Sequence, residues 1–331
     1  MGAATATVEG DLRRQVRESR AIAFFGTWAI VGLFVDGWAH QANKPETFFT
    51  PWHFMLYSGF VAAVLWFAWD GRRSGARGRT EVVPAPSDRL ASIGLVAFVI
   101  GGVGDGIWHE VFGVEVDLEA LLSPTHLLLM TGGLLMLSAP VRWALSERTL
   151  RDSTRHLEFA PVLVALTLCS SLATFFTMYA GANWPIARFD EGENGEVVGV
   201  ASVLARNLLV MAPLLFARLH WRLPVGSWTL MLGANALLMS ALEGFRFPQL
   251  VIPFVIGGIV GDALSMASNG RRAVPWWAYA LAVPFATWSS FFAVHELAWG
   301  IEWTVELWTG AIFLAMASAY GLGALMQPRT S

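Results

Sequence analysis

Cysteine and charged residues are scarce in this sequence, and each shortage excludes a class of protein. Cys169 is the single cysteine among 331 residues, so an internal disulfide is impossible and a thiolate metal cluster is excluded. Charged residues make up 14% of the chain, whereas an ordinary soluble domain has about 25%. Hydrophobic residues make up 55% and form runs that reach the ~20 residues needed to span a bilayer. The composition therefore predicts an all-α, polytopic membrane helical bundle.

The apolar runs predict about ten transmembrane helices, arranged as repeated hairpins that cross the membrane out and back. Residues 1–20 are predicted to be a polar cytoplasmic segment and not a cleavable signal, because four arginines lie between Arg13 and Arg20. Residues 21–142 form a four-helix region, and residues 143–331 contain six further transmembrane helices. The predicted spans are 21–40, 52–69, 91–109, 124–142, 160–180, 199–217, 226–244, 248–267, 275–295 and 303–325.

The positive charge is distributed on one side of the predicted membrane. The N-terminal segment, alternate loops and the C-terminus hold 18 of the 22 Lys and Arg residues, and only Lys44, Arg188, Arg206 and Arg246 lie elsewhere. Since cytoplasmic loops carry the excess of positive charge, both termini are expected in the cytoplasm, in a multi-pass protein of the cell (plasma) membrane. The other side holds 15 of the 25 acidic residues, and an acidic rim concentrates cations.

A pattern of one aspartate and two histidines occurs twice in the first half of the chain. In each copy an Asp and a His four residues apart precede a short link and the sequence Ser/Thr-Pro-x-His. Residues at this spacing lie one above the other on one face of a helix. Ser or Thr suits the N-cap and Pro the first helical position, so the second His falls on the third residue of the next helix. Each hairpin is thus predicted to gather two imidazoles and a carboxylate, a ligand set that suits copper, zinc or non-haem iron. The two sets are Asp36, His40 and His53, and Asp105, His109 and His126.

Other polar residues near the spans are additional candidates for a site. The last hairpin carries His295, with Glu302 and Glu306 beyond it, and this group is a possible third polar cluster. Arg206 lies inside a predicted span, where a charge is costly enough to suggest a carboxylate partner or a substrate-facing role. Glu110 could add an oxygen ligand to the second set. Carboxylate oxygen favours harder ions, and only the second set has further carboxylates such as Glu110 beside it. We therefore expect the first set to be the tighter copper site.

The first set resembles the metal site of the C-type membrane component of the particulate methane and ammonia monooxygenases. The resemblance rests on Asp36, on His40 four residues later, and on His53 thirteen residues beyond in a Thr-Pro-x-His context, followed by the aromatic sequence 57–60. It covers roughly 100 residues and implies copper bound within the membrane by these three side chains. The chain departs from that family in its larger number of predicted spans and in Asp105, where the family has Asn.

Two classes of function are compatible with these residues. In the enzyme interpretation, copper held by either set gives a monooxygenase-like oxidoreductase that oxidises a small apolar substrate arriving from the lipid bilayer. In the binding interpretation, the sets hold, sense, transport or load a metal ion without catalysis. Iron or zinc would suit the same ligands, and interfacial histidines of a structural protein would need no metal. Partner subunits or a homo-oligomer fit both interpretations, whereas a net charge of −3 gives no reason to expect nucleic acid.

Overall fold

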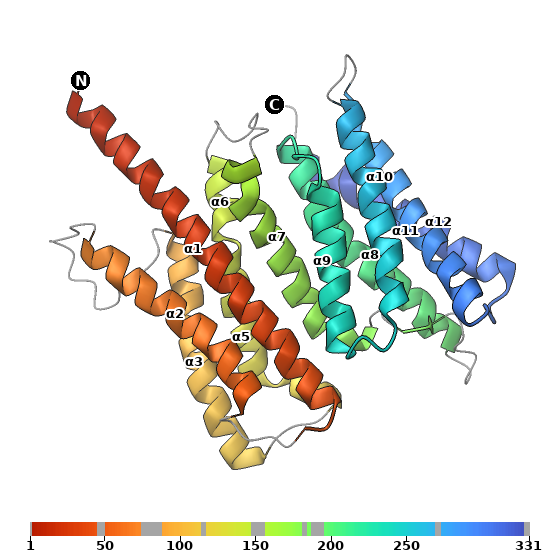
Figure 1. The fold of residues 1–331 in the computed structure, drawn as a ribbon, viewed down its shortest axis with the longest axis horizontal. Helices are drawn as coiled ribbons and strands as arrows, with labels where there is room; N and C mark the ends of the chain where they lie inside the picture. The colour runs from red at the N-terminus through yellow and green to blue at the C-terminus, as the bar shows by residue number, and fades with distance from the viewer. Residues whose placement is uncertain are drawn as a thin grey trace. The chain divides into compact units, whose positions relative to one another are not determined.

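The computed structural model describes residues 2–44, 50–73, 88–113, 117–146, 156–180, 184–186, 195–268 and 273–327. Within these ranges the chain is helical and has no β-strand (Figure 1). Nine of the described helical segments are long and apolar enough to cross a membrane. The prediction of a polytopic membrane helical bundle is confirmed.

The helices correspond to the predicted spans, although several extend beyond them: the first helix, Gly2–Gln41, begins well before residue 21. Two spans differ in their continuity or length. The predicted span 124–142 is interrupted at Ser138, because Pro140 has no N–H to continue the hydrogen-bond ladder. The predicted span 226–244 forms a helix of only 16 residues, shorter than the other nine. The α-helices are α1 (Gly2–Gln41), α2 (Pro51–Arg73), α3 (Arg89–Phe112), α4 (Asp117–Leu122), α5 (Pro124–Leu137), α6 (Ala139–Ser146), α7 (His156–Phe176), α8 (Gly195–His220), α9 (Ser227–Leu242), α10 (Ile252–Ser268), α11 (Trp276–Ala298) and α12 (Val305–Met326), with 3₁₀ turns η2 (Met178–Ala180) and η4 (Pro248–Val251).

The chain divides into two compact units. The first unit is Met1–Arg148 with Ala160–Leu172, and the second is Thr149–Phe159 with Ala173–Ser331. In the first unit α1 packs against α2, and α3 packs against α5. In the second unit α9, α10, α11 and α12 pack in chain order, and α8 packs against α12. Both Asp/His/His sets belong to the first unit.

Glycines bring α1 and α2 into direct backbone contact. A Cβ atom added at Gly32 of α1 would lie 2.6 Å from the backbone nitrogen of Leu56 on α2. A Cβ added at Gly59 of α2 would lie 2.8 Å from the backbone nitrogen of Ala29 on α1. Small residues at such positions allow two membrane helices to approach closely. The hairpin therefore needs glycine on both helices at this crossing.

The second hairpin is built in the same register. A Cβ at Gly101 of α3 would meet Leu129 of α5 at 3.0 Å, and one at Gly132 would meet the backbone nitrogen of Phe98 at 2.8 Å. Gly101 lies four residues before Asp105, as Gly32 lies four residues before Asp36. Gly132 lies six residues after His126, as Gly59 lies six residues after His53. The repeat therefore includes the helix crossing as well as the six polar residues.

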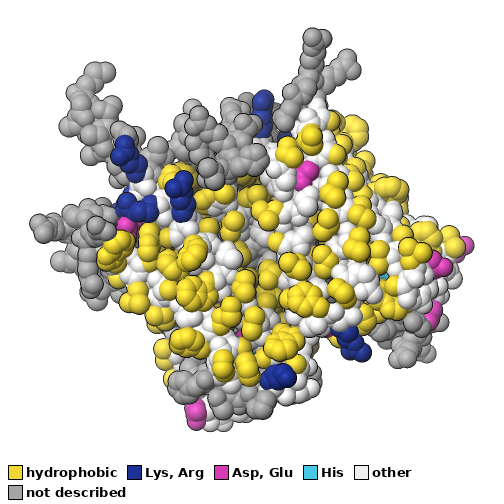
Figure 2. Space-filling view, viewed as in Figure 1, with side chains coloured by type: hydrophobic (Ala, Val, Ile, Leu, Met, Phe, Trp, Pro, Cys, Tyr) yellow, Lys and Arg dark blue, Asp and Glu magenta, His cyan; other side chains and the backbone are white. Residues whose placement is uncertain are grey.

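Ion pairs occupy the end of the first unit opposite the two Asp/His/His sets. Arg17 Nε lies 2.7 Å from Asp70 Oδ1, and Arg142 Nε lies 2.7 Å from Asp88 Oδ2. Burial raises the pKa of the Asp88 carboxyl, but hydrogen bonds from Arg142 and from the N–H of Ala91 outweigh it, so this pKa lies below its ordinary value. Lys and Arg side chains gather over this end, near the start of α1, and hydrophobic side chains cover the helices beyond it (Figure 2).

Candidate metal centre

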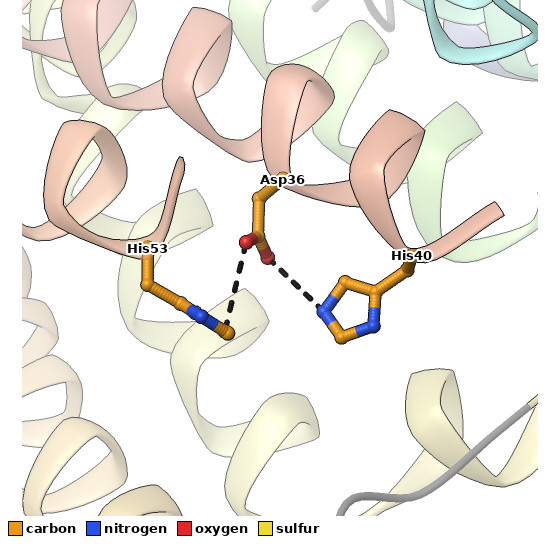
Figure 3. Close-up of side chains that lie close together, drawn as sticks. All are labelled: Asp36, His40 and His53. Carbon is orange, nitrogen blue, oxygen red and sulfur yellow. Dashed lines mark ion pairs between the residues drawn. The ribbon is translucent and has the colours of Figure 1, made fainter. Parts of the chain in front are cut away.

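The first triad, Asp36, His40 and His53, forms where α1 ends and α2 begins (Figure 3). Asp36 points between the two imidazole rings: its Oδ2 is 3.6 Å from Nε2 of His40, and its Oδ1 is 3.6 Å from Nε2 of His53. The ring centroids are 5.7 Å apart. Ligand atoms around one tetrahedral ion with bonds of ~2.0–2.1 Å lie about 3.4 Å apart, so these separations suit a single bound ion.

The carboxylate of Asp36 can accept more hydrogen bonds than the described residues donate to it. Asp36 is only 7% exposed, and its Oδ1 has no hydrogen-bond partner among the described residues. A buried charged oxygen without a partner is costly, and burial is tolerated where the charge is paired or coordinates a metal. The two histidine nitrogens at 3.6 Å are too distant for direct hydrogen bonds. A cation between the three side chains would compensate this cost.

The start of α2 orients His53. Thr50 precedes the helix, Pro51 is its first residue and His53 its third, as the sequence predicts. The Thr50 Oγ1 lies 2.9 Å from Nδ1 of His53. A hydrogen bond to one ring nitrogen fixes the ring and determines which nitrogen faces a metal. The Nε2 atom of His53 is thereby directed at Asp36.

The second triad, Asp105, His109 and His126, has the same construction at the end of α3 and the start of α5. Asp105 Oδ1 lies 3.6 Å from Nε2 of His109 and 2.9 Å from Nε2 of His126. The ring centroids are 5.9 Å apart, almost the separation in the first triad. Ser123 is the N-cap of α5 and accepts a hydrogen bond from the backbone N–H of His126. The 2.9 Å contact is a direct hydrogen bond, so Asp105 and His126 lie closer together than Asp36 lies to either histidine of the first triad.

Asp105 has two more partners, and one of them comes from the first hairpin. The Tyr57 hydroxyl of α2 donates to Asp105 Oδ2 at 3.0 Å, and the Thr125 hydroxyl donates to Oδ1 at 3.3 Å. Asp105 and His109 also interact electrostatically with His53. The two triads are therefore neighbours, linked by a direct hydrogen bond between the hairpins.

The predicted additional ligands lie elsewhere. Glu110 is exposed at the end of α3 and joins neither triad. His295 is fully buried in the second unit, between the rings of Phe291 and Trp299, whereas Glu302 and Glu306 are exposed. Among the described residues of the chain, the two triads are the only groups with metal-binding geometry. The structure does not bring His295 and the two glutamates together as a third cluster.

Arg206 is buried in the second unit, as expected of a residue inside a span. It is 2% exposed, and its guanidinium lies over the ring of Phe254, 5.3 Å from the centroid. It lines a small pocket that Ser240 and Glu243 also line. Arg206 and Glu243 thus share one pocket, and the carboxylate partner expected for Arg206 stays a prediction.

Comparison with known proteins gives no match: no family model, no curated protein and no solved structure matches this chain. The resemblance to the C-type component of the monooxygenases thus rests on the motif alone, and the copper chemistry that it implies stays a prediction.

Proposed function

We propose that this multi-pass membrane protein binds transition-metal ions at its two triads, with copper in the first, and that it oxidises a small apolar substrate in the manner of a copper monooxygenase. The observation that carries the proposal is the first triad. The buried Asp36 carboxylate lies 3.6 Å from two imidazole nitrogens, and its Oδ1 accepts no hydrogen bond from the described residues; all three side chains come from the ends of two packed helices.

The chemistry of the donor set is compatible with copper, and the motif resemblance is the reason to propose copper among the metals that fit. Imidazole suits copper, zinc, iron and nickel, and two imidazoles with one carboxylate leave coordination positions open. A copper ion bound there would supply one-electron redox chemistry and an open position for dioxygen. The protein's contribution is to hold Nε2 of each histidine and the Asp36 carboxylate in place, with Thr50 fixing the His53 ring.

The surroundings of the triads support an apolar substrate. Trp38, Phe54 and Ile107 are neighbours of the ligands in sequence, and they are 36%, 72% and 60% exposed on the outside of their helices. In a membrane these side chains would face lipid, where a small apolar molecule is concentrated. The triads lie at helix ends, whereas transporters place their substrate and ion sites near the midplane in broken helices. This placement favours the enzyme over a metal permease.

Metal analysis tests the first half of the proposal. Full-length protein purified in detergent is loaded with Cu(II), freed of unbound ion and examined by elemental analysis and electron paramagnetic resonance. We expect two copper ions per chain with nitrogen hyperfine structure, and their loss in the variant that combines Asp36→Ala with Asp105→Ala. Wild-type protein that retains no metal, or a double variant that retains all of it, would contradict the proposal.

Oxidation of a short alkane by the copper-loaded protein, with dioxygen and a chemical reductant, tests the second half. Product that depends on both triads supports the enzyme. Copper bound at both triads without any product would instead support a protein that senses, carries or loads the metal.

A further inference from the structure

The second triad receives part of its support from the first hairpin. Tyr57 lies four residues after His53 on α2, and its hydroxyl donates to Asp105 Oδ2 at 3.0 Å. Residues four apart share one helix face, so α2 presents a ligand of the first triad and a hydrogen-bond donor to the second on the same side. We propose that Tyr57 is a positioning residue that couples the two triads, so that metal binding at the second depends on the state of the first. This inference rests on the proposed metal binding.

The hydrogen bond between the hairpins has no counterpart in the opposite direction, because the repeat is broken at this position. Met130 follows His126 by four residues, as Tyr57 follows His53, and a thioether has no hydrogen to donate. Within the described part of the chain, Oδ1 of Asp36 has no hydrogen-bond donor that corresponds to Tyr57. Two triads with the same three ligand types thus differ in how the carboxylate is held.

This difference has a consequence for ligation. Tyr57 engages Oδ2 of Asp105, and the other oxygen, Oδ1, faces both His109 and His126. Asp105 would therefore offer a metal ion one oxygen in a fixed direction. Each oxygen of Asp36 faces a different histidine, so this carboxylate could offer either oxygen or both. The structure thus favours a pre-oriented, single-oxygen carboxylate in the second triad.

The path of the coupling is one turn of α2. A metal ion bound by His53 would fix the helix face that also carries Tyr57, and Tyr57 in turn would hold Asp105. Loss of an outer hydrogen bond to a metal ligand typically lowers metal affinity by about 10–100-fold. We expect a loss of that size at the second triad when the hydroxyl is removed.

Copper titration of the Tyr57→Phe variant tests the inference. Cu(II) is titrated into the full-length protein in detergent, and the two sites are followed by electron paramagnetic resonance, with His126→Ala and His53→Ala used to assign each signal. Tyr57→Phe should weaken the second site by about 10–100-fold and change its spectrum, while the first site keeps its affinity and spectrum. Tyr179→Phe, which removes an exposed hydroxyl from the second unit, should change neither site.

A double-mutant cycle tests the coupling itself. His53→Ala should weaken copper binding at the second site in the wild-type background and have little further effect when Tyr57 is already phenylalanine. An unchanged second site in Tyr57→Phe would overturn the positioning role, as would an equal loss at both sites. Additive effects in the cycle would overturn the coupling. Wild-type protein without any bound copper would overturn the proposed function and the inference together.

Discussion

Replacing Gly32 by alanine tests whether the close contact of α1 and α2 sets the geometry of the first triad. The new Cβ would lie 2.6 Å from the nitrogen and 2.7 Å from the Cα of Leu56. Ordinary contacts of this kind are ~3.5 Å long, and helix backbone cannot rotate aside as a side chain can. The two helices would have to separate by roughly 0.9 Å at this point.

This displacement reaches the triad because the ligands are one turn away. Asp36 follows Gly32 by four residues, and His53 precedes Leu56 by three. A metal site tolerates displacements of only about 0.5 Å from its productive geometry. We therefore expect the copper affinity of the first triad to fall by about 10–100-fold, the scale of other perturbations just outside the ligand shell. The second triad should weaken only to the extent that it is coupled to the first through Tyr57.

Gly310→Ala is the matched control. Gly310 lies inside α12, and a Cβ added there meets no atom within 4 Å. Both substitutions gain the same helix propensity, up to ~1 kcal/mol, so only the contact with α2 distinguishes them. Calorimetric copper titration and thermal unfolding of both variants provide the comparison. Wild-type copper affinity in Gly32→Ala, or an equal loss in Gly310→Ala, would refute the role assigned to the helix crossing.

Three further predictions address the sites, the opposite end of the first unit and the topology. His53→Ala should remove the copper of the first triad, whereas His126→Ala should leave it in place; unchanged metal content in both variants would show that these histidines are not ligands. Asp88→Asn keeps an effective N-cap but loses the ion pair, and we expect a destabilisation of about 1 kcal/mol at pH 7. Because the pKa of the Asp88 carboxyl in the folded protein is depressed, the difference in free energy of unfolding between the variant and wild type should shrink as the pH falls below about 4. A difference that does not change with pH would contradict this prediction. In a chain whose native cysteine is replaced by serine, Lys44→Cys should be labelled from outside intact cells and Arg77→Cys should not; labelling of the latter would reverse the orientation.

The sequence was sufficient to predict the helices and the two triads, because both depend on local patterns. Hydrophobic runs predict spans, and the spacing of Asp36 and His40 places both on one face of α1. Thr50 and Pro51 predict where α2 begins and hence where His53 lies. Each of these relations lies within one helix or one turn, so it can be predicted from the spacing of residues alone.

The contacts between hairpins could not be predicted in the same way. That Tyr57 reaches Asp105 depends on how α2 lies beside α3, which no local pattern contains. A sequence signal was present only for the helix crossing within each hairpin, since Gly32 and Gly101 have the same offset from the aspartate of their repeat. The surroundings of the polar residues in the last hairpin also depend on packing: His295 lies against the rings of Phe291 and Trp299, both glutamates are exposed, and their role in a site stays a prediction.

Anomalous diffraction at the copper absorption edge, from crystals of the copper-loaded protein, tests the central claim most directly. We expect one peak between Asp36, His40 and His53 and a second between Asp105, His109 and His126. Copper peaks elsewhere in the chain, with both triads empty, would contradict it.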